Sequence, residues 1–121
     1  MHPKLRTCIA YVAGRLISGR DATSIYDKSQ AKDIFIEGPV TPASVKVFDR
    51  DRGCYLSGLG DENAYELYDF GGMYYVELIV TGNTFEGYDH GTPSLFKGEM
   101  NGDDITMYDD AFSETFSFVL K

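Results

Sequence analysis

The chain contains 121 residues, 43% of them hydrophobic, and carries a formal net charge of −8 at pH 7. This length suits a sizeable core, so residues 1–121 are expected to form a single domain. No run of 18 apolar residues occurs, so no transmembrane span is expected. The excess of acidic residues argues against nucleic acid as a partner.

The segment from Pro3 to Ser18 is predicted to form a helix. Its apolar residues recur at helical spacing, at Leu5, Cys8, Ile9, Val12, Ala13, Leu16 and Ile17. Pro3 suits the first turn, and Gly19 suits the stop. The middle of the opposite face is also weakly polar and holds Thr7, Ala10, Tyr11 and Gly14. We therefore expect residues 1–20 to supply an N-terminal helix that is buried nearly all round.

The first 20 residues contain four cations and no acids, which leaves a net charge of −12 on the other 101 residues. The cations are Lys4, Arg6, Arg15 and Arg20. Arg15 interrupts the apolar stretch and no convincing cleavage site follows it, so a signal peptide is not favoured. A cytoplasmic location is expected, with export as the alternative.

An aromatic residue followed by aspartate recurs along the rest of the chain. The pairs are Tyr26-Asp27, Phe48-Asp49, Tyr68-Asp69, Tyr88-Asp89 and Tyr108-Asp109, and their aspartates stand 22, 20, 20 and 20 residues apart. A period this short holds one supersecondary unit per repeat and leaves little room for an asymmetric catalytic site.

Each repeat is predicted to be a hairpin of two strands. Apolar residues stand mostly two and four places before each Asp with a polar residue between them, the pattern of a strand with one buried face. A second alternating run begins about seven residues after each Asp and places Ile36, Leu56, Val76, Phe96 and Phe116 in equivalent positions.

The fold class predicted from these patterns is mainly β, a ten-stranded antiparallel barrel of five hairpin petals over residues 23–121. The first unit supplies only its strand before Asp and the last only its strand after Asp. Pairing these two strands would close the ring and remove both sheet edges. A barrel of this size admits the N-terminal helix at its centre. The inward glycines Gly38, Gly58, Gly87 and Gly98 are expected to make room for that helix.

Successive antiparallel strands reverse direction, so the five repeat aspartates are expected on one rim. They are Asp27, Asp49, Asp69, Asp89 and Asp109. Two interpretations stay open: each Asp caps its turn by accepting backbone N–H bonds, or the carboxylates bind a hard metal cation. The aromatic residue before each Asp is expected to pack against Phe35, Tyr55 and Tyr75, with a ligand-stacking belt as the alternative.

The short link over residues 19–22 predicts the direction of the helix. Because this link cannot cross the barrel, the helix C-terminus should lie on the rim opposite Asp27. Lys4 and Arg6 would then reach the Asp rim, where they would offset its carboxylates. Charge partners are expected at Asp69 and Asp89.

The remaining polar residues indicate no catalytic site. Cys8 and Cys54 show neither metal-ligand spacing nor a disulfide framework. His2 and His90 have no recognisable serine or cysteine partner for nucleophilic catalysis. We therefore expect no enzymatic activity and no cofactor.

The hairpin repeat over residues 24–121 and the hydrophobic helix over residues 3–18 together resemble the β-flower proteins. These are small bacterial barrels of repeated hairpin petals with a hydrophobic helix at the centre. Choline-binding repeats have hairpins of similar length but rely on tryptophan, which is absent here. The Tyr-Asp repeats of large bacterial shell proteins share the aromatic-Asp pair but continue with Gly-Arg, which this chain lacks. The resemblance transfers no functional residue.

The expected role is a non-enzymatic binding or interaction module for a hydrophobic ligand, a lipid or a protein. The alternative is a structural or cation-binding domain that uses the Asp rim. A monomer is expected.

Overall fold

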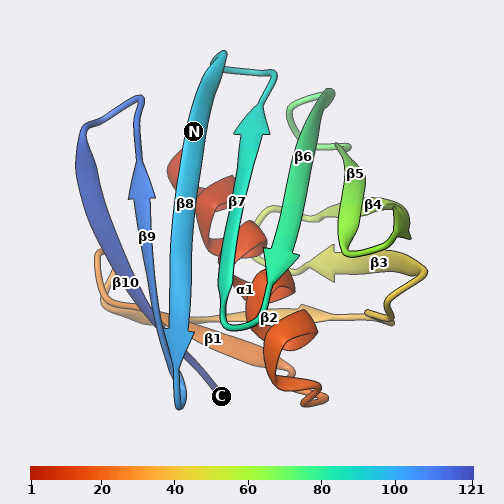
Figure 1. The fold of residues 1–121 in the computed structure, drawn as a ribbon. Coiled ribbons are helices and arrows are strands. Elements are labelled where there is room, and N and C mark those ends of the chain that lie inside the picture. Colours follow the sequence, from red (N-terminus) through yellow and green to blue (C-terminus); the bar gives the residue numbers. More distant parts are fainter.

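The computed structural model describes residues 1–121 as a closed antiparallel barrel of ten strands around one helix (Figure 1). The helix is α1 (Pro3–Ser18). The strands are β1 (Ser24–Asp27), β2 (Lys32–Glu37), β3 (Ser44–Asp49), β4 (Cys54–Asp61), β5 (Ala64–Asp69), β6 (Tyr74–Thr81), β7 (Thr84–Asp89), β8 (Ser94–Asn101), β9 (Asp104–Asp109) and β10 (Glu114–Leu120). The predicted fold class, mainly β with a closed ten-stranded barrel and one N-terminal helix, is confirmed.

The ring closes through the first and last strands. β1 pairs with β10 in antiparallel register, with Ile25 opposite Leu120 and Asp27 opposite Phe118. Most neighbouring strands share six paired positions, as β3 and β4 do. In contrast, β2 and β3 share only two, Ile36 with Asp49 and Glu37 with Phe48. The barrel therefore has no free sheet edge along most of its wall, and its thinnest contact is the β2–β3 seam.

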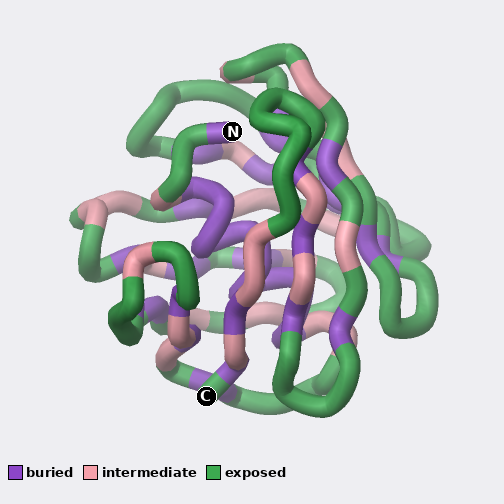
Figure 2. The backbone as a smooth tube through the Cα atoms, turned by 90° about the vertical axis from the view of Figure 1, so that its left-hand side faces the viewer, coloured by how far each residue is buried: buried purple, intermediate pink, exposed green.

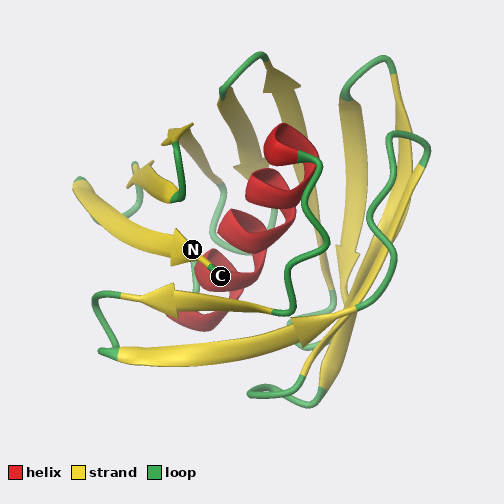
Figure 3. Cartoon of the chain, turned by 90° about the horizontal axis from the view of Figure 1, so that it is seen from below, coloured by secondary structure: helices red, strands yellow, loops and turns green.

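The helix fills the interior along its length (Figure 3). Pro3 occupies the first turn, the His2 side chain accepts a hydrogen bond from the Lys4 backbone N–H, and Gly19 ends the helix in the left-handed conformation. Every residue from 5 to 15 is buried. The helix is apolar nearly all round because it is enclosed by the wall on every side.

Inward-facing side chains of the strands complete the core. They alternate with exposed residues along each strand, as the predicted period of two requires, and Figure 2 shows this alternation beside the buried helix. Val47, Leu67, Leu78 and Met107 are fully buried and belong to one cluster of 27 residues that includes the helix. The helix and the barrel wall therefore share a single core.

The wall glycines have a different role from the one expected. A Cβ atom added to Gly98 would collide with the Thr106 carbonyl oxygen and the Phe85 ring, both on neighbouring strands. A Cβ atom on Gly87 would likewise collide with a β6 carbonyl oxygen and the Phe96 ring. Gly38 and Gly58 meet the carbonyl oxygens of Lys46 and Glu66. The expectation that these glycines make room for the helix is wrong, because strand carbonyls and strand aromatic rings occupy the space.

The small residue at the contact between helix and wall lies on the helix. A Cβ atom on Gly14 would stand 2.7 Å from Cδ1 of Ile105 and 3.4 Å from Cδ2 of Leu120. Gly14 therefore lets α1 approach β9 and β10 closely.

The turns that follow the five repeat aspartates all lie at one end of the barrel, which we call the Asp rim. The N-terminus of α1 lies at this end and its C-terminus at the other, as the short link over residues 19–22 predicts (Figure 1). No helix in the structure is long and apolar enough to cross a membrane.

Candidate functional site

All five repeat aspartates are buried, with exposed fractions of 0–3%. In each case Oδ1 accepts a hydrogen bond from the backbone N–H two residues further on. The five donors are Ser29, Asp51, Gly71, Gly91 and Ala111. This shared geometry is an Asx turn, in which the carboxylate organises the connection between two strands.

The residue three positions after Asp donates to the second carboxylate oxygen in four of the five turns. The donors are the Gln30 side chain, the Arg52 side chain, the Gly72 backbone and the Thr92 side chain. This pattern can be read from the sequence, since polar side chains stand at three of these four positions, but the sequence analysis did not identify it. Each of these turns therefore satisfies both oxygens of its own aspartate.

The helix supplies further partners to the rim. Arg6 Nε and Nη2 lie 3.3 and 3.2 Å from Oδ2 of Asp109, and the Thr7 hydroxyl donates to Oδ2 of Asp27 at 2.5 Å. The Arg6 guanidinium also lies 3.4 Å from the centroid of the Phe116 ring. Lys4 Nζ lies 3.2 Å from Oδ2 of Asp51, in the turn after β3.

The structure thus places both predicted cations, Lys4 and Arg6, at the Asp rim but gives them other partners than Asp69 and Asp89. Asp69 is held by Arg52, and Asp89 accepts a hydrogen bond from Thr92. The predicted partners are wrong because Arg6 faces the end of β9 and Lys4 faces the turn after β3.

Arg52 is the rim residue that the sequence analysis missed. Its Nε lies 3.0 Å from Oδ2 of Asp49, and its Nη1 lies 3.0 Å from Oδ1 of Asp69. Burial alone would lower the pKa of this guanidinium, but the hydrogen bonds and charge of Asp69, together with Asp49, raise it above its usual range. Arg52 therefore stays charged and neutralises two neighbouring turns.

Asp27 lacks a cationic partner and is held by neutral donors instead. Burial raises the pKa of this carboxyl, but hydrogen bonds from Thr7, Ser29 and Gln30 outweigh that effect, so its pKa lies below the usual value. Asp27 is thus ionised at neutral pH.

The rim geometry favours turn capping over cation binding. No three His, Cys, Asp or Glu side chains are grouped so that they could hold a metal ion. The carboxylate oxygens instead face the N–H and O–H donors of the turns and the helix.

Neither cysteine is poised as a reactive thiolate. Cys8 is fully buried on α1, and burial raises the pKa of its thiol well above the usual value. Cys54 is half-buried at the start of β4, and burial raises its pKa as well.

The aromatic residues before the aspartates face outward, and two of them, Phe48 and Tyr68, pair with rings of the neighbouring strand. The ring centroids of Phe48 and Tyr55 are 4.9 Å apart in an edge-to-face arrangement, and Tyr68 and Tyr75 repeat this geometry at 4.9 Å. Phe35 is a diagonal neighbour of Tyr26, since Tyr26 stands directly opposite Asp33 in the β1–β2 register, and the packing of these two rings stays a prediction.

Large apolar side chains are exposed around the outside of the barrel at the Asp rim. This apolar collar consists of Phe35, Tyr55, Phe70, Met73, Tyr74, Tyr75, Leu95 and Phe112, all 44–71% exposed. Three of them, Phe70, Met73 and Phe112, belong to the turns of the Asp rim. Three of the connections at the opposite end, residues 61–63, 82–83 and 102–103, carry polar residues instead, whereas the connection over residues 38–43 holds Pro39, Val40 and Pro42.

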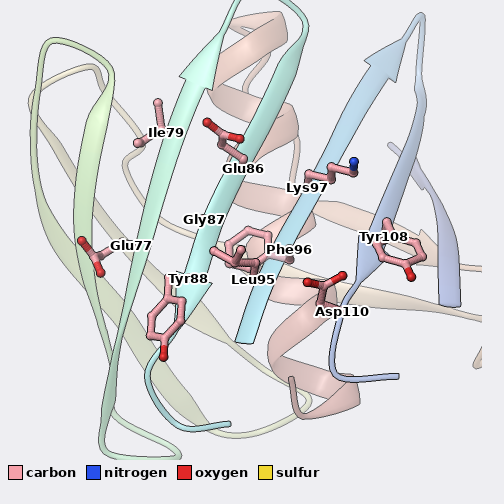
Figure 4. A pocket seen from close by; sticks show the side chains of 10 residues that line it. All are labelled: Glu77, Ile79, Glu86, Gly87, Tyr88, Leu95, Phe96, Lys97, Tyr108 and Asp110. Carbon is pink, nitrogen blue, oxygen red and sulfur yellow. The ribbon is translucent and has the colours of Figure 1, made fainter. Parts of the chain in front are cut away.

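A groove of about 400 Å³ lies on the outer face of β6–β9, and Figure 4 shows the side chains that line it. It shares Ile79, Glu86, Lys97 and Tyr108 with a neighbouring hollow of about 550 Å³, so the two form one continuous groove. The buried rings of Phe96 and Phe85 lie under the groove beside the glycines of the adjacent strand, Gly87 and Gly98.

Comparisons with protein-family models, curated proteins and solved structures gave no match to this chain.

Proposed function

We propose that this protein is a non-enzymatic binding module that docks on a lipid interface through the apolar collar at its Asp rim. The observation that carries the proposal is the gathering of eight exposed large apolar side chains around one end of the barrel. Large apolar side chains that gather in one exposed region of a folded protein mark interaction sites. The closed barrel with its central helix also supports assigning the chain to the β-flower family as part of this proposal.

The filled interior directs binding to the outside of the barrel. Residues 5–15 of the helix are buried against the wall, and Tyr11 and Arg15 hydrogen-bond to the backbone carbonyls of Ala22 and Gly38. Release of the helix would break these bonds and expose the apolar core to water. A ligand inside the barrel would have to displace a well-anchored helix, so an external surface is favoured.

The distribution of the collar favours a lipid surface over a flat protein partner. Its members come from β2, β4, the β5–β6 turn, β6, β8 and the β9–β10 turn, which together span most of the circumference. A flat partner would cover only one side of this ring, whereas a bilayer interface surrounds an end that enters it. Tyrosine suits such a position because its ring is apolar and its hydroxyl remains hydrated.

The charged residues also favour an orientation in which the collar end faces the lipid. The five aspartates of the rim are shielded by turns and by cationic partners. The exposed cations Lys28, Lys32 and Arg50 and the half-buried Lys4 lie at the same end, together with the exposed acids Asp51, Asp110 and Glu114. The opposite end carries Asp61, Glu62 and Asp103 in its turns. The lysines and arginine of the collar end suit contact with anionic headgroups.

Vesicle flotation tests the proposal, with phosphatidylcholine vesicles prepared with and without phosphatidylserine. The wild-type protein is expected to float with both kinds of vesicle. Phe70→Ser with Met73→Ser should weaken partitioning by at least about tenfold, since each buried apolar side chain contributes about 1.5–3 kcal/mol.

Leu59→Ser is the matched control, because Leu59 is 75% exposed on β4 but lies outside the collar. Its partitioning should match that of the wild type. Absence of flotation for the wild type, or an equal loss in the control, would overturn the lipid proposal.

A further inference from the structure

The residue Met1 is buried inside the Asp rim. It is only 1% exposed and belongs to the same apolar core as the helix. Its α-ammonium lies 3.2 Å from Oδ2 of Asp109 and 3.9 Å from Oδ2 of Asp89. Both carboxylates are buried as well, with exposed fractions of 0% and 2%. The rim therefore encloses a charged group of a kind that folded proteins usually leave in water.

The last turn of the rim lacks a donor of its own for the second carboxylate oxygen. The third position after Asp109 holds Phe112, whose backbone N–H bonds to the Asp109 carbonyl oxygen instead. The donors at this position in the other four turns are Gln30, Arg52, Gly72 and Thr92. In the last turn the Met1 ammonium and the Arg6 guanidinium face Oδ2 of Asp109. The ammonium therefore takes the place of the missing donor.

Arg6 connects the two partners of this contact. Its Nη2 lies 3.2 Å from Oδ2 of Asp109 and 3.4 Å from the Met1 carbonyl oxygen. Two positive groups thus meet two buried carboxylates, Asp89 and Asp109, and their charges balance. The loss of either positive group would leave net negative charge in the interior.

We propose that the Asp rim contains an ammonium site, which the α-amino group of Met1 fills and which Nα-acylation empties. Acylation converts the ammonium into a neutral amide, so Asp109 loses a charged donor. The acyl group also needs space beside a residue that is only 1% exposed. Met1 is therefore a modification-sensitive position of the fold. This inference does not rest on the lipid proposal.

The modifying step is an ordinary acyl transfer from a thioester. The amine nitrogen loses a proton and forms an amide bond to the acyl carbon. The carbon–sulfur bond breaks, and the thiolate leaves with its electron pair and takes up the proton. Because the folded rim encloses Met1, this transfer has to occur before the barrel closes around the helix.

Cys8 allows a direct test, because native chemical ligation joins a synthetic thioester of residues 1–7 to a chain of residues 8–121. The product is the full chain without a foreign residue. Three versions are compared by urea unfolding: the free α-amine, the Nα-acetyl form, and a form in which hydrogen replaces the α-amino group. The last form removes the charge without adding bulk. Both altered forms should lower the ratio of folded to unfolded protein by about 10- to 100-fold.

Acetylation of Lys4 Nζ in the same synthetic peptide is the matched control. It removes the same charge and adds the same group, but the Lys4 side chain is 43% exposed and pairs with Asp51. Its effect on the ratio should be no more than about fivefold. Equal losses at Met1 and Lys4, or no loss in the Nα-acetyl form, would overturn the ammonium site. A loss in the Nα-acetyl form alone would show a steric effect and would also overturn it.

Protection of the α-amine in the folded protein provides a second measurement. An acetylating reagent should modify Met1 at least about tenfold more slowly than Lys4, as measured by mass spectrometry of peptides, because Met1 reacts only after the rim opens. In urea this protection should disappear. A Met1 amine that reacts as fast as Lys4 in the folded protein would place the ammonium in solvent and overturn the proposal.

Discussion

Arg6 Nη2 lies 3.2 Å from Oδ2 of Asp109, and the two side chains are only 3% and 1% exposed. Arg6 comes from the central helix and Asp109 from the end of β9, so this pair connects the helix to the barrel wall. The N-terminal ammonium of Met1 also lies 3.2 Å from Oδ2 of Asp109, so the loss of Arg6 leaves this buried carboxylate with one of its two cationic partners.

Arg6→Met is therefore expected to lower the free energy of unfolding by about 1–3 kcal/mol, because Asp109 loses its guanidinium hydrogen bonds but keeps the Met1 ammonium. Urea unfolding monitored by circular dichroism would measure the change. The loss should persist at high salt, since buried charges are screened far less than exposed ones.

Two companion variants make this result specific. Adding Asp109→Asn to Arg6→Met should recover part of the loss, because it removes the buried carboxylate that has lost its guanidinium partner. Lys4→Met breaks the more exposed pair with Asp51 and should cost no more than about 1 kcal/mol. Equal costs for Lys4→Met and Arg6→Met would show that burial does not distinguish the two pairs.

Asp27 predicts a defined pH dependence. Its pKa is lowered in the folded protein, so its contribution to stability is complete above the unfolded-state pKa of about 3.9 and is lost as pH falls through the folded value. Asp27→Asn should destabilise the protein by about 1–3 kcal/mol at pH 7, because an amide donor then faces the Gln30 amide. Thermal unfolding at pH 7 and pH 3 would compare the two proteins. If the stability difference between the wild type and Asp27→Asn were the same at both pH values, the role assigned to the ionised carboxylate would be contradicted.

Gly98→Val is expected to cost about 1–3 kcal/mol or more, because its side chain would enter the space of the Thr106 carbonyl and the Phe85 ring. Lys97→Val, at the adjacent exposed position on the same strand, is the control and should change stability by less than about 0.5 kcal/mol. Chemical denaturation would measure both. A neutral Gly98→Val would mean that β8 and β9 can separate locally without loss.

Removal of residues 1–18 should abolish cooperative folding. The deletion takes away the whole helix and leaves the inner wall facing an empty apolar space. The truncated chain is expected to associate or to bind a hydrophobic dye, and size-exclusion chromatography with a thermal melt would show this. A monomeric truncation product with a sharp transition would mean that the barrel stands without its helix.

Patterns of regular period were sufficient to predict the elements. The helical spacing from Leu5 to Ile17 gave a helix with the observed bounds, and the repeating aromatic-Asp pair placed all ten strands and the closure between the first and the last. These features depend on local periodicity, which a single sequence displays directly.

Contacts between elements were not predictable in the same way. The packing of Phe35 depends on a register shifted by the insertion near residues 28–33, and the bridge that Arg52 makes depends on the spacing of two turns. The roles of Gly87 and Gly98 depend on rings from neighbouring strands. Such contacts arise from tertiary geometry, so the candidate site was located at the correct rim but with several wrong partners.

The pairing of β1 with β10 has a consequence for how the chain is made. β1 follows directly from the helix, and its partner residues, Phe118 to Leu120, lie about 95 positions further along. A growing chain on the ribosome can form its middle hairpins early, because their contacts are local. The ring, however, cannot shut around the helix until residues 118–120 have emerged. Until then the barrel wall does not fully enclose the helix. A pause in synthesis before those residues would leave the apolar surface of the helix exposed to chaperones or to aggregation.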